Sequence, residues 1–261
     1  WFGAADYGAD ARVGGSACSE EAWTSDTAIR ARIAGGVSGT RRVAVTVGAQ
    51  VGTTSALSSY DIPSVSGLVG VNGPASGDVS VTVVGSGFGE QDYSATMRVG
   101  GTTCGSSEWT ADSSIRCFLP GGVMDRELNG RHVRVSVGGQ VGTLTSGFTY
   151  DEPLASTAVA TNSPTTGDVS MTVSGAHYAR SDYSASVRVG GTVCGDSEWT
   201  ADTGVRCRLP AGVAGTRRVA VSVNTDVGTV TGVGSYDIPS ASSLVGVNGP
   251  ASGDVSVTVV G

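Results

Sequence analysis

The stretch DVSVTVVG, residues 78–85, alternates apolar and polar positions, a pattern that indicates a β-strand. Its valines Val79, Val81 and Val83 share one face, as period-two alternation places them in a half-buried strand. The same pattern recurs in HVRVSVGG, residues 132–139, and no segment carries a helical period longer than two turns. Short valine-rich strands separated by glycine-rich turns predict an all-β protein.

One segment is written three times along the 261 residues. The copies open at Asp6, Asp92 and Asp182, and the third stops at Gly261, which aligns with Gly85. About seven short strands in each copy predict a sandwich of two packed sheets. We expect an internal piece of a longer polypeptide, cut within a repeat. The expected boundaries are 1–62 for the closing part of a domain, 63–152 and 153–238 for complete domains, and 239–261 for the opening strands of the next.

Charge and motifs narrow the functional classes. The net charge is -7, whereas a nucleic-acid partner would favour a basic surface. All sixteen basic residues are arginine, which excludes lysine-based covalent catalysis. The longest apolar runs are too short to span a membrane. Without a catalytic triad, metal-binding or phosphate-loop motif, the sequence predicts neither an enzyme nor a cofactor or metal site.

The order of motifs in the second repeat is informative. It runs GVNGPASGDVSVTVVGSGFG from Gly70, then MRVGGTTC, FLPGG, VRVSVGG, and GFTY ending at Tyr150. This order resembles the immunoglobulin-like TIG (IPT) domain of plexins, fibrocystin-like ectodomains and large surface proteins of algae and protists. The third repeat departs from it at GAHY, residues 175–178, where the family has a Gly-x-Gly-Phe turn. The resemblance covers the whole chain and implies tandem immunoglobulin-like sandwiches in an extracellular rod or filament.

The resemblance also implies one disulfide in each complete repeat. The pairs are Cys104 with Cys117 and Cys194 with Cys207, each thirteen residues apart. Closing a loop of about 14 residues is worth roughly 3 kcal/mol in the chain-entropy model. Free or metal-bound thiols are the alternative, although two cysteines without a nearby histidine are few for a metal site. Disulfides would place the protein outside the cell.

The first repeat has Ala31 where the others have their second cysteine. Cys18 is therefore expected to be unpaired within its own chain. It is either the buried relic of a lost pair or the site of a bond to a neighbouring chain.

Each cysteine block also holds a tryptophan and a Thr-x-Asp turn. We expect the tryptophan to cover the sheet end, with carbohydrate stacking as the alternative. The aspartate is expected in an Asx turn, since one carboxylate is too little for calcium. The positions are Trp23, Trp109 and Trp199, and Asp26, Asp112 and Asp202.

The second repeat carries four extra residues in the loop from Met124 to Arg131. Charged groups surround Leu128 there, which makes the loop a candidate for contact with a ligand or a neighbouring molecule, or else a tolerated surface insertion. The candidate contact residues are Met124, Asp125, Arg126, Glu127, Leu128 and Asn129.

No Asn-x-Ser/Thr sequon is present, so surface glycans would be O-linked. The candidate sites are Ser/Thr-rich strand edges and prolines beside Ser, Thr or Ala. Those prolines are Pro63, Pro74, Pro164, Pro239 and Pro250.

Residues 239–261 are almost identical to residues 63–85, the opening strands that residues 1–62 lack. We expect Val255, Val257 and Val259 to pack inside the incomplete domain of the next copy, head to tail, as an open filament requires. In one version the polypeptide is continuous and this chain is one period of a long repeat array. In the other, separate subunits donate strands across a break. The sequence thus predicts a structural repeat protein of an extracellular filament or cell-surface fibre, such as a flagellar hair. The alternative is an adhesin or receptor ectodomain that binds a protein or glycan.

Overall fold

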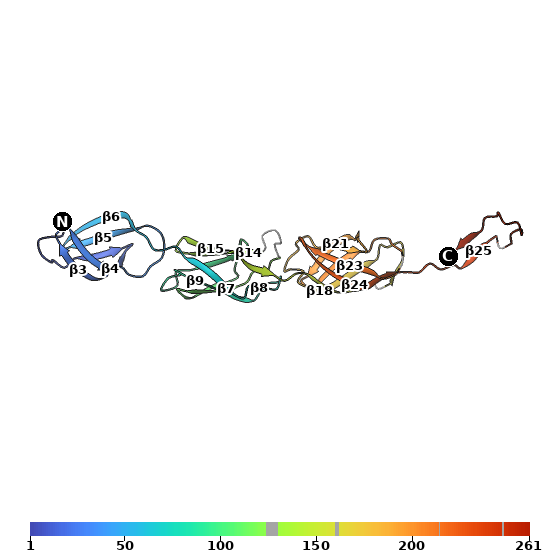
Figure 1. Ribbon diagram of the computed structural model, residues 1–261, viewed down its shortest axis with the longest axis horizontal. Coiled ribbons are helices and arrows are strands. Elements are labelled where there is room, and N and C mark those ends of the chain that lie inside the picture. Colours follow the sequence, from blue (N-terminus) through green and yellow to red (C-terminus); the bar gives the residue numbers. More distant parts are fainter. Residues whose placement is uncertain (124–129, 160–161, 214, 247) are drawn as a thin grey trace. The chain divides into compact units, whose positions relative to one another are not determined.

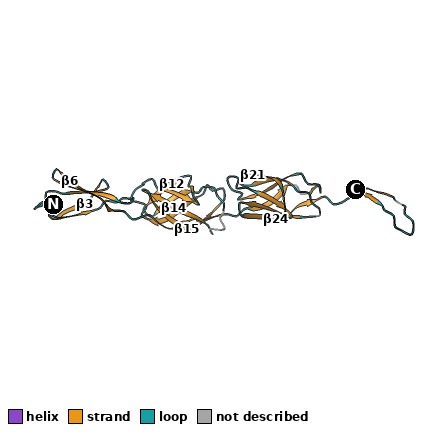
Figure 2. Ribbon diagram, turned by 90° about the horizontal axis from the view of Figure 1, so that it is seen from above, coloured by secondary structure: helices purple, strands orange, loops and turns teal. Residues whose placement is uncertain are grey.

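The computed structural model describes residues 1–123, 130–159, 162–213, 215–246 and 248–261. Every regular element in these ranges is a β-strand (Figures 1 and 2), which confirms the all-β prediction. Two compact units make up the chain, Trp1–Asp151 and Glu152–Gly261.

The second repeat is a two-sheet sandwich within the first unit. One sheet has the strand order β11-β10-β14-β15-β8 and the other β12-β13-β9-β7. All neighbours are antiparallel except β8, which runs parallel to the end of β15. The strands are β7 Ser64–Val69, β8 Asn72–Gly73, β9 Ser80–Ser86, β10 Thr96–Val99, β11 Thr102–Thr103, β12 Ser107–Ala111, β13 Ser114–Phe118, β14 Arg131–Val137 and β15 Gln140–Tyr150.

The core of this sandwich is made of the alternate strand positions expected from the sequence. Val133, Val135 and Val137 of β14 are at most 1% exposed. Facing them, Val81 and Val83 of β9 are 2% and 0% exposed, as period-two alternation requires. The prediction was wrong for Val79, which is 37% exposed although its carbonyl accepts a hydrogen bond from the amide of Leu119.

The third repeat has the same two sheets in the second unit, β17-β24-β23-β19-β20 and β16-β18-β22-β21. Met171 and Val173 take the places of Val81 and Val83 and are fully buried. Its strands are β16 Leu154–Val159, β17 Asn162–Ser163, β18 Ser170–Ala176, β19 Ser186–Val189, β20 Thr192–Val193, β21 Gly195–Ala201, β22 Gly204–Arg208, β23 Arg217–Val223 and β24 Asp226–Tyr236.

The first repeat holds only part of this arrangement. Its larger sheet has the order β2-β1-β5-β6, and β3 with β4 forms a separate hairpin. Val43, Val45 and Val47 of β5 are only half-buried, although the matching valines of β14 are buried completely. The strands are β1 Asp10–Val13, β2 Ser16–Ala17, β3 Ser19–Ser25, β4 Ala28–Arg32, β5 Arg41–Val47 and β6 Gln50–Ser58.

The last strands, β25 Ser243–Val245 and β26 Thr258–Val260, form an antiparallel pair in the second unit. Within the single chain, Val255, Val257 and Val259 are 54%, 53% and 60% exposed. The candidate contact residues Met124–Asn129 lie outside the described residues, so that prediction stays a prediction.

Candidate assembly site

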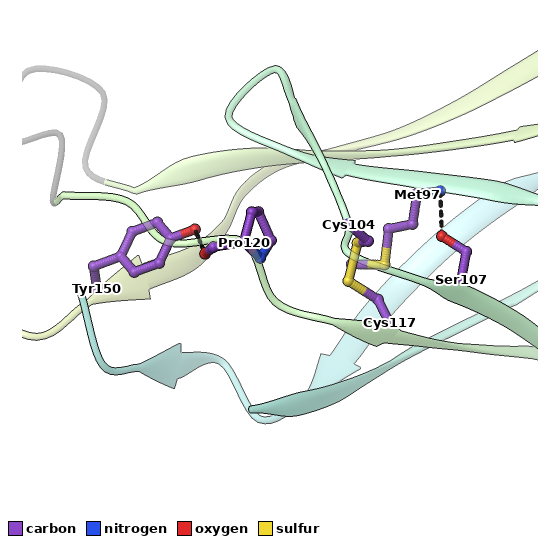
Figure 3. Close-up of a disulfide and its surroundings, with 6 residues drawn as sticks. All are labelled: Met97, Cys104, Ser107, Cys117, Pro120 and Tyr150. Atoms are coloured by element: carbon purple, nitrogen blue, oxygen red, sulfur yellow. Dashed lines mark hydrogen bonds between the residues drawn. A yellow bond between two sulfur atoms is a disulfide. The ribbon is translucent and has the colours of Figure 1, made fainter. Parts of the chain in front are cut away.

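The cysteine block of the second repeat ties the two sheets together. Cys104 follows β11, Cys117 lies in β13, and a disulfide joins them with their Cα atoms 5.8 Å apart (Figure 3). Both sulfurs belong to the core, since Cys104 is 7% exposed and Cys117 is fully buried. Ser107 of β12 accepts the amide of Met97 at 3.0 Å, a second link between the sheets close to the first.

The matching cysteines of the third repeat, Cys194 and Cys207, are thiols in the structure and are equally buried. Their side chains are hydrogen-bonded to each other, which lowers the pKa of Cys194 and, together with burial, raises the pKa of Cys207. Their disulfide stays a prediction.

Cys18 of the first repeat has the backbone setting of a paired cysteine. Its amide donates to the carbonyl of Ala11 at 2.9 Å, as that of Cys104 donates to Met97 at 3.0 Å. The side chain is half-buried, and burial, then the charge of Glu21, raises the pKa of the thiol. Cys18 therefore stays protonated and weakly nucleophilic at neutral pH.

The tryptophans lie half-buried at the edge of each core, and Trp109 packs against it as expected. The indole of Trp199 donates to the carbonyl of Tyr178 at 2.8 Å. The aspartates were expected in Asx turns, but two of them accept hydrogen bonds from glycine amides 23 residues earlier in the chain. Asp26 accepts the amide of Gly3 at 2.9 Å and Asp112 that of Gly89 at 2.8 Å, so each carboxylate anchors a glycine turn rather than only its own hairpin.

The tyrosine that closes each repeat makes a hydrogen bond that the sequence did not reveal. Tyr60, Tyr150 and Tyr236 donate their hydroxyls to backbone carbonyls of Ala34, Pro120 and Pro210 at 2.7, 2.8 and 2.7 Å. The signal was present: each repeat ends on tyrosine and contains a loop of the type AGGV, PGGV or PAGV. The tyrosine holds this loop at the end of the sandwich.

Among the described residues, β4 of the first repeat has a strand partner on one side only. In the second repeat, β13 pairs with β12 on one side and with β9 on the other, with Cys117 opposite Val81. Among the described residues, β4 pairs with β3 alone. Ala31 is the β4 residue that matches Cys117. In the tail, residues 239–261, Val257 matches Val81.

The tail already has the geometry of the missing strands. Leu244 pairs with Val259 in the β25–β26 hairpin, as Leu68 pairs with Val83 between β7 and β9. All three residue pairs of the tail hairpin correspond to pairs of the β7–β9 ladder at the same offset. The turn before β26 is also shared, because the amide of Gly253 donates to the carbonyl of Pro250 as Gly77 does to Pro74, both at 2.9 Å.

Within the described ranges, no three His, Cys, Asp or Glu side chains gather as metal ligands would. None of the described segments forms a helix long and apolar enough to cross a membrane.

Solved structures with similar folds come from several settings. The extracellular region of plexin A4, domains 1 to 8, is 18% identical with a TM-score of 0.34, over 67% of this chain and 18% of that one. The surface glycan-binding protein PbSGBP-B from Prevotella bryantii is 11% identical with a TM-score of 0.43, over 66% and 42%. The I9-I11 tandem of titin is 8% identical with a TM-score of 0.29, over 88% of both chains. This chain thus spans less than half of the plexin and glycan-binding chains.

No curated protein is similar enough to count as a match. The family comparison is positive, because the sequence model of the IPT/TIG domain matches residues 63–151 and 153–238, the two complete sandwiches. The match covers more than half of the chain and agrees with the motif order of the second repeat. The chain belongs to the IPT/TIG domain family.

Proposed function

We propose that this chain is the repeating part of an extracellular filament or cell-surface fibre, in which residues 239–261 of one copy complete residues 1–62 of the next. The observation that carries the proposal is the match between an incomplete sandwich and a preformed hairpin. The β4 edge lacks the neighbour that β13 has, and the tail hairpin has the register of the strands that provide it.

The side chains on the two surfaces support this pairing. In the second repeat, Ile115 of β13 lies opposite Val83 and both are fully buried. The same alignment places Ile29 opposite Val259, which are half-buried and 60% exposed in the single chain. Burying a valine or isoleucine side chain stabilises by about 1.5–3 kcal/mol, so several such residues give a substantial driving force.

Open strand edges and exposed apolar faces favour strand addition in general. An edge and a donor in different repeats of one sequence form a heterologous contact, and such a contact that does not close on itself generates a filament. An extracellular location and a structural rather than enzymatic role are parts of the same proposal. They agree with the buried disulfide of the second repeat and with a family built of immunoglobulin-like domains.

The proposal is tested by self-association of the 261-residue chain in sedimentation velocity over a range of concentrations. We expect oligomers that grow with concentration. Val257→Asp should weaken association by about a hundredfold or more, because the complete repeat buries the matching Val81 and a buried unpaired carboxylate is costly.

The matched control is Val245→Asp. Val245 is 62% exposed, and the matching Val69 remains 65% exposed even in the complete repeat. This variant should associate like the parent chain. A chain that stays monomeric at every concentration, or equal behaviour of the two variants, would contradict the proposal.

A further inference from the structure

The first two repeats meet at a joint within the unit Trp1–Asp151. Val37, in the loop between β4 and β5, is only 6% exposed because it lies against the second repeat. A Cβ placed on Gly138 would lie 2.6 Å from Cγ2 of Val37, and one on Gly89 would lie 3.0 Å from Cγ1. Gly89 and Gly138 therefore form a glycine socket that admits this valine because they have no side chains.

Two further contacts surround the socket. The amide of Gln140 donates to the carbonyl of Tyr60 at 3.4 Å. Gly35 lies against the side chain of Glu90, where a Cβ would be 2.4 Å from the carboxylate carbon. The joint thus combines an apolar insertion with a hydrogen bond and a close approach that requires glycine at position 35.

The loop that presents the valine is built in the same way in each repeat. The closing tyrosine bonds the loop carbonyl three residues earlier, and an arginine donates to the carbonyl of the valine itself, at 2.7 Å for Arg41 and Val37. Arg217 makes the same bond to Val213 in the third repeat. Val213 is nevertheless 66% exposed, against 6% for Val37.

The first repeat carries the matching glycine socket. Gly3 and Gly48 have φ of +94° and +59°, close to the +98° and +55° of Gly89 and Gly138. Asp26 anchors Gly3 as Asp112 anchors Gly89. A Cβ on Gly48 would meet no atom within 4 Å, and the neighbouring Tyr7 is 61% exposed. This socket is therefore already formed and is accessible in the single chain.

The residues around the valine and the socket change together. In the observed joint, Gly35 faces the long side chain of Glu90. In the loop of Val213, Ala211 stands at the position of Gly35. In the socket of the first repeat, Ala4 stands at the position of Glu90. Ala211 thus adds a Cβ that Gly35 lacks, and the opposing residue Ala4 has a shorter side chain than Glu90. Gln50 retains the place of Gln140.

We infer that Val213 of one copy inserts between Gly3 and Gly48 of a second copy, with Gln50 donating to the carbonyl of Tyr236. The inference rests on the proposed function, since Tyr236 leads directly into the tail strands that complete the same repeat. It adds a second contact to strand addition, one that fixes how successive copies are oriented. The continuity with the observed joint of Val37 identifies the partner as another copy of this sequence.

The first test is the strength of self-association of Val213→Asp in sedimentation velocity. We expect association about tenfold weaker, since the contact of one buried valine is lost. The matched control is Val193→Asp, because Val193 is 49% exposed and the second repeat has Thr103 at that position. Weakening confined to Val213→Asp supports the inference, and equal behaviour of the two variants overturns it.

The second test is disulfide trapping in a Cys18→Ser chain. The pair Val37→Cys with Gly138→Cys should form a bond within one chain, because the two Cβ positions are 3.2 Å apart. Asn224, at φ of +54° in the third repeat, shows that a side chain is tolerated at the position of Gly138. The pair Val213→Cys with Gly48→Cys should form bonds between chains and yield a ladder of oligomers.

The outcomes separate the two proposals. If the first pair forms and the second does not, while Val257→Asp still blocks association, the joint is wrong and strand addition stands. If the parent chain does not associate at all, both are wrong. A ladder from the second pair that disappears with Val257→Asp confirms the joint together with the strand addition on which it rests.

Discussion

Tyr150 donates its hydroxyl to the carbonyl of Pro120 at 2.8 Å, and this bond holds the loop at the end of the second sandwich (Figure 3). The ring covers Gly122, where a Cβ would lie 2.6 Å from its carbon atoms. The same relationship joins Tyr60 to Gly36 and Tyr236 to Gly212. A hydrogen bond between residues 26 to 30 positions apart in the sequence thus fixes the loop that presents the valine of the joint.

Gly122→Ala should destabilise the second repeat by about 1–3 kcal/mol, because the new methyl group overlaps the ring of Tyr150. Urea unfolding followed by tryptophan fluorescence measures the change. The control is Gly67→Ala, where a Cβ would meet nothing within 4 Å. Equal stability of the two variants would show that the tyrosine does not hold the loop tightly.

Tyr178→Phe should stabilise the third repeat or leave its stability unchanged. Tyr178 is completely buried, and its hydroxyl has no hydrogen-bond partner among the described residues, a cost of about 1–3 kcal/mol that phenylalanine avoids. The other repeats have Phe2 and Phe88 at this position. Thermal unfolding measures the change in stability. A loss of more than about 1 kcal/mol of unfolding free energy, the net contribution of a typical hydrogen bond, would show that the hydroxyl makes a stabilising contact.

The same substitution should alter stability at high pH. Burial raises the pKa of Tyr178 to about 12, whereas an unfolded tyrosine titrates near 10. The ionised form of Tyr178 is disfavoured in the folded state. The stability that the neutral Tyr178 side chain contributes is therefore complete below pH about 10 and is lost as pH rises through about 12. Tyr178→Phe should show a shallower decline over this window. Identical pH profiles would contradict the assignment.

Ala31→Cys should restore the missing disulfide with Cys18. The thirteen-residue spacing and the backbone bond of Cys18 match those of the Cys104–Cys117 pair, so the expected gain is roughly 3 kcal/mol for the first repeat. Non-reducing peptide mapping would detect the bond. Two free thiols after oxidation would mean that β4 is displaced from the position that β13 holds.

Ala4→Glu should weaken self-association about two- to threefold, because Ala211 then faces a long side chain across the proposed joint. Adding Ala211→Gly recreates the Gly35–Glu90 combination of the observed joint and should restore the parent affinity. Sedimentation velocity measures both variants. If the second substitution gives no recovery, the two alanines do not face each other.

The fold was predictable because its signals are local. Alternating valines such as Val133 and Val135 mark a strand with one buried face, and the structure buries both. The glycine socket was not predictable, since Gly89 and Gly138 are far apart in sequence and meet only through tertiary folding. The sequence places Tyr150 at the end of its repeat, but the bond of Tyr150 to Pro120 depends on a loop position that periodicity does not reveal.

Pairing between the tail of one copy and β4 of another can be tested directly by disulfide trapping. Arg30→Cys chains and Thr258→Cys chains, each with Cys18→Ser, should be mixed and oxidised. The matching pair in the second repeat, Arg116 and Thr82, faces across neighbouring strands, so Arg116→Cys with Thr82→Cys provides the positive control within one chain. We expect a disulfide-linked mixed dimer, and a ladder of oligomers when both substitutions are on one chain. If the control forms its bond but the mixed chains remain monomeric, or the double variant yields only a bond within one chain, head-to-tail strand addition is wrong.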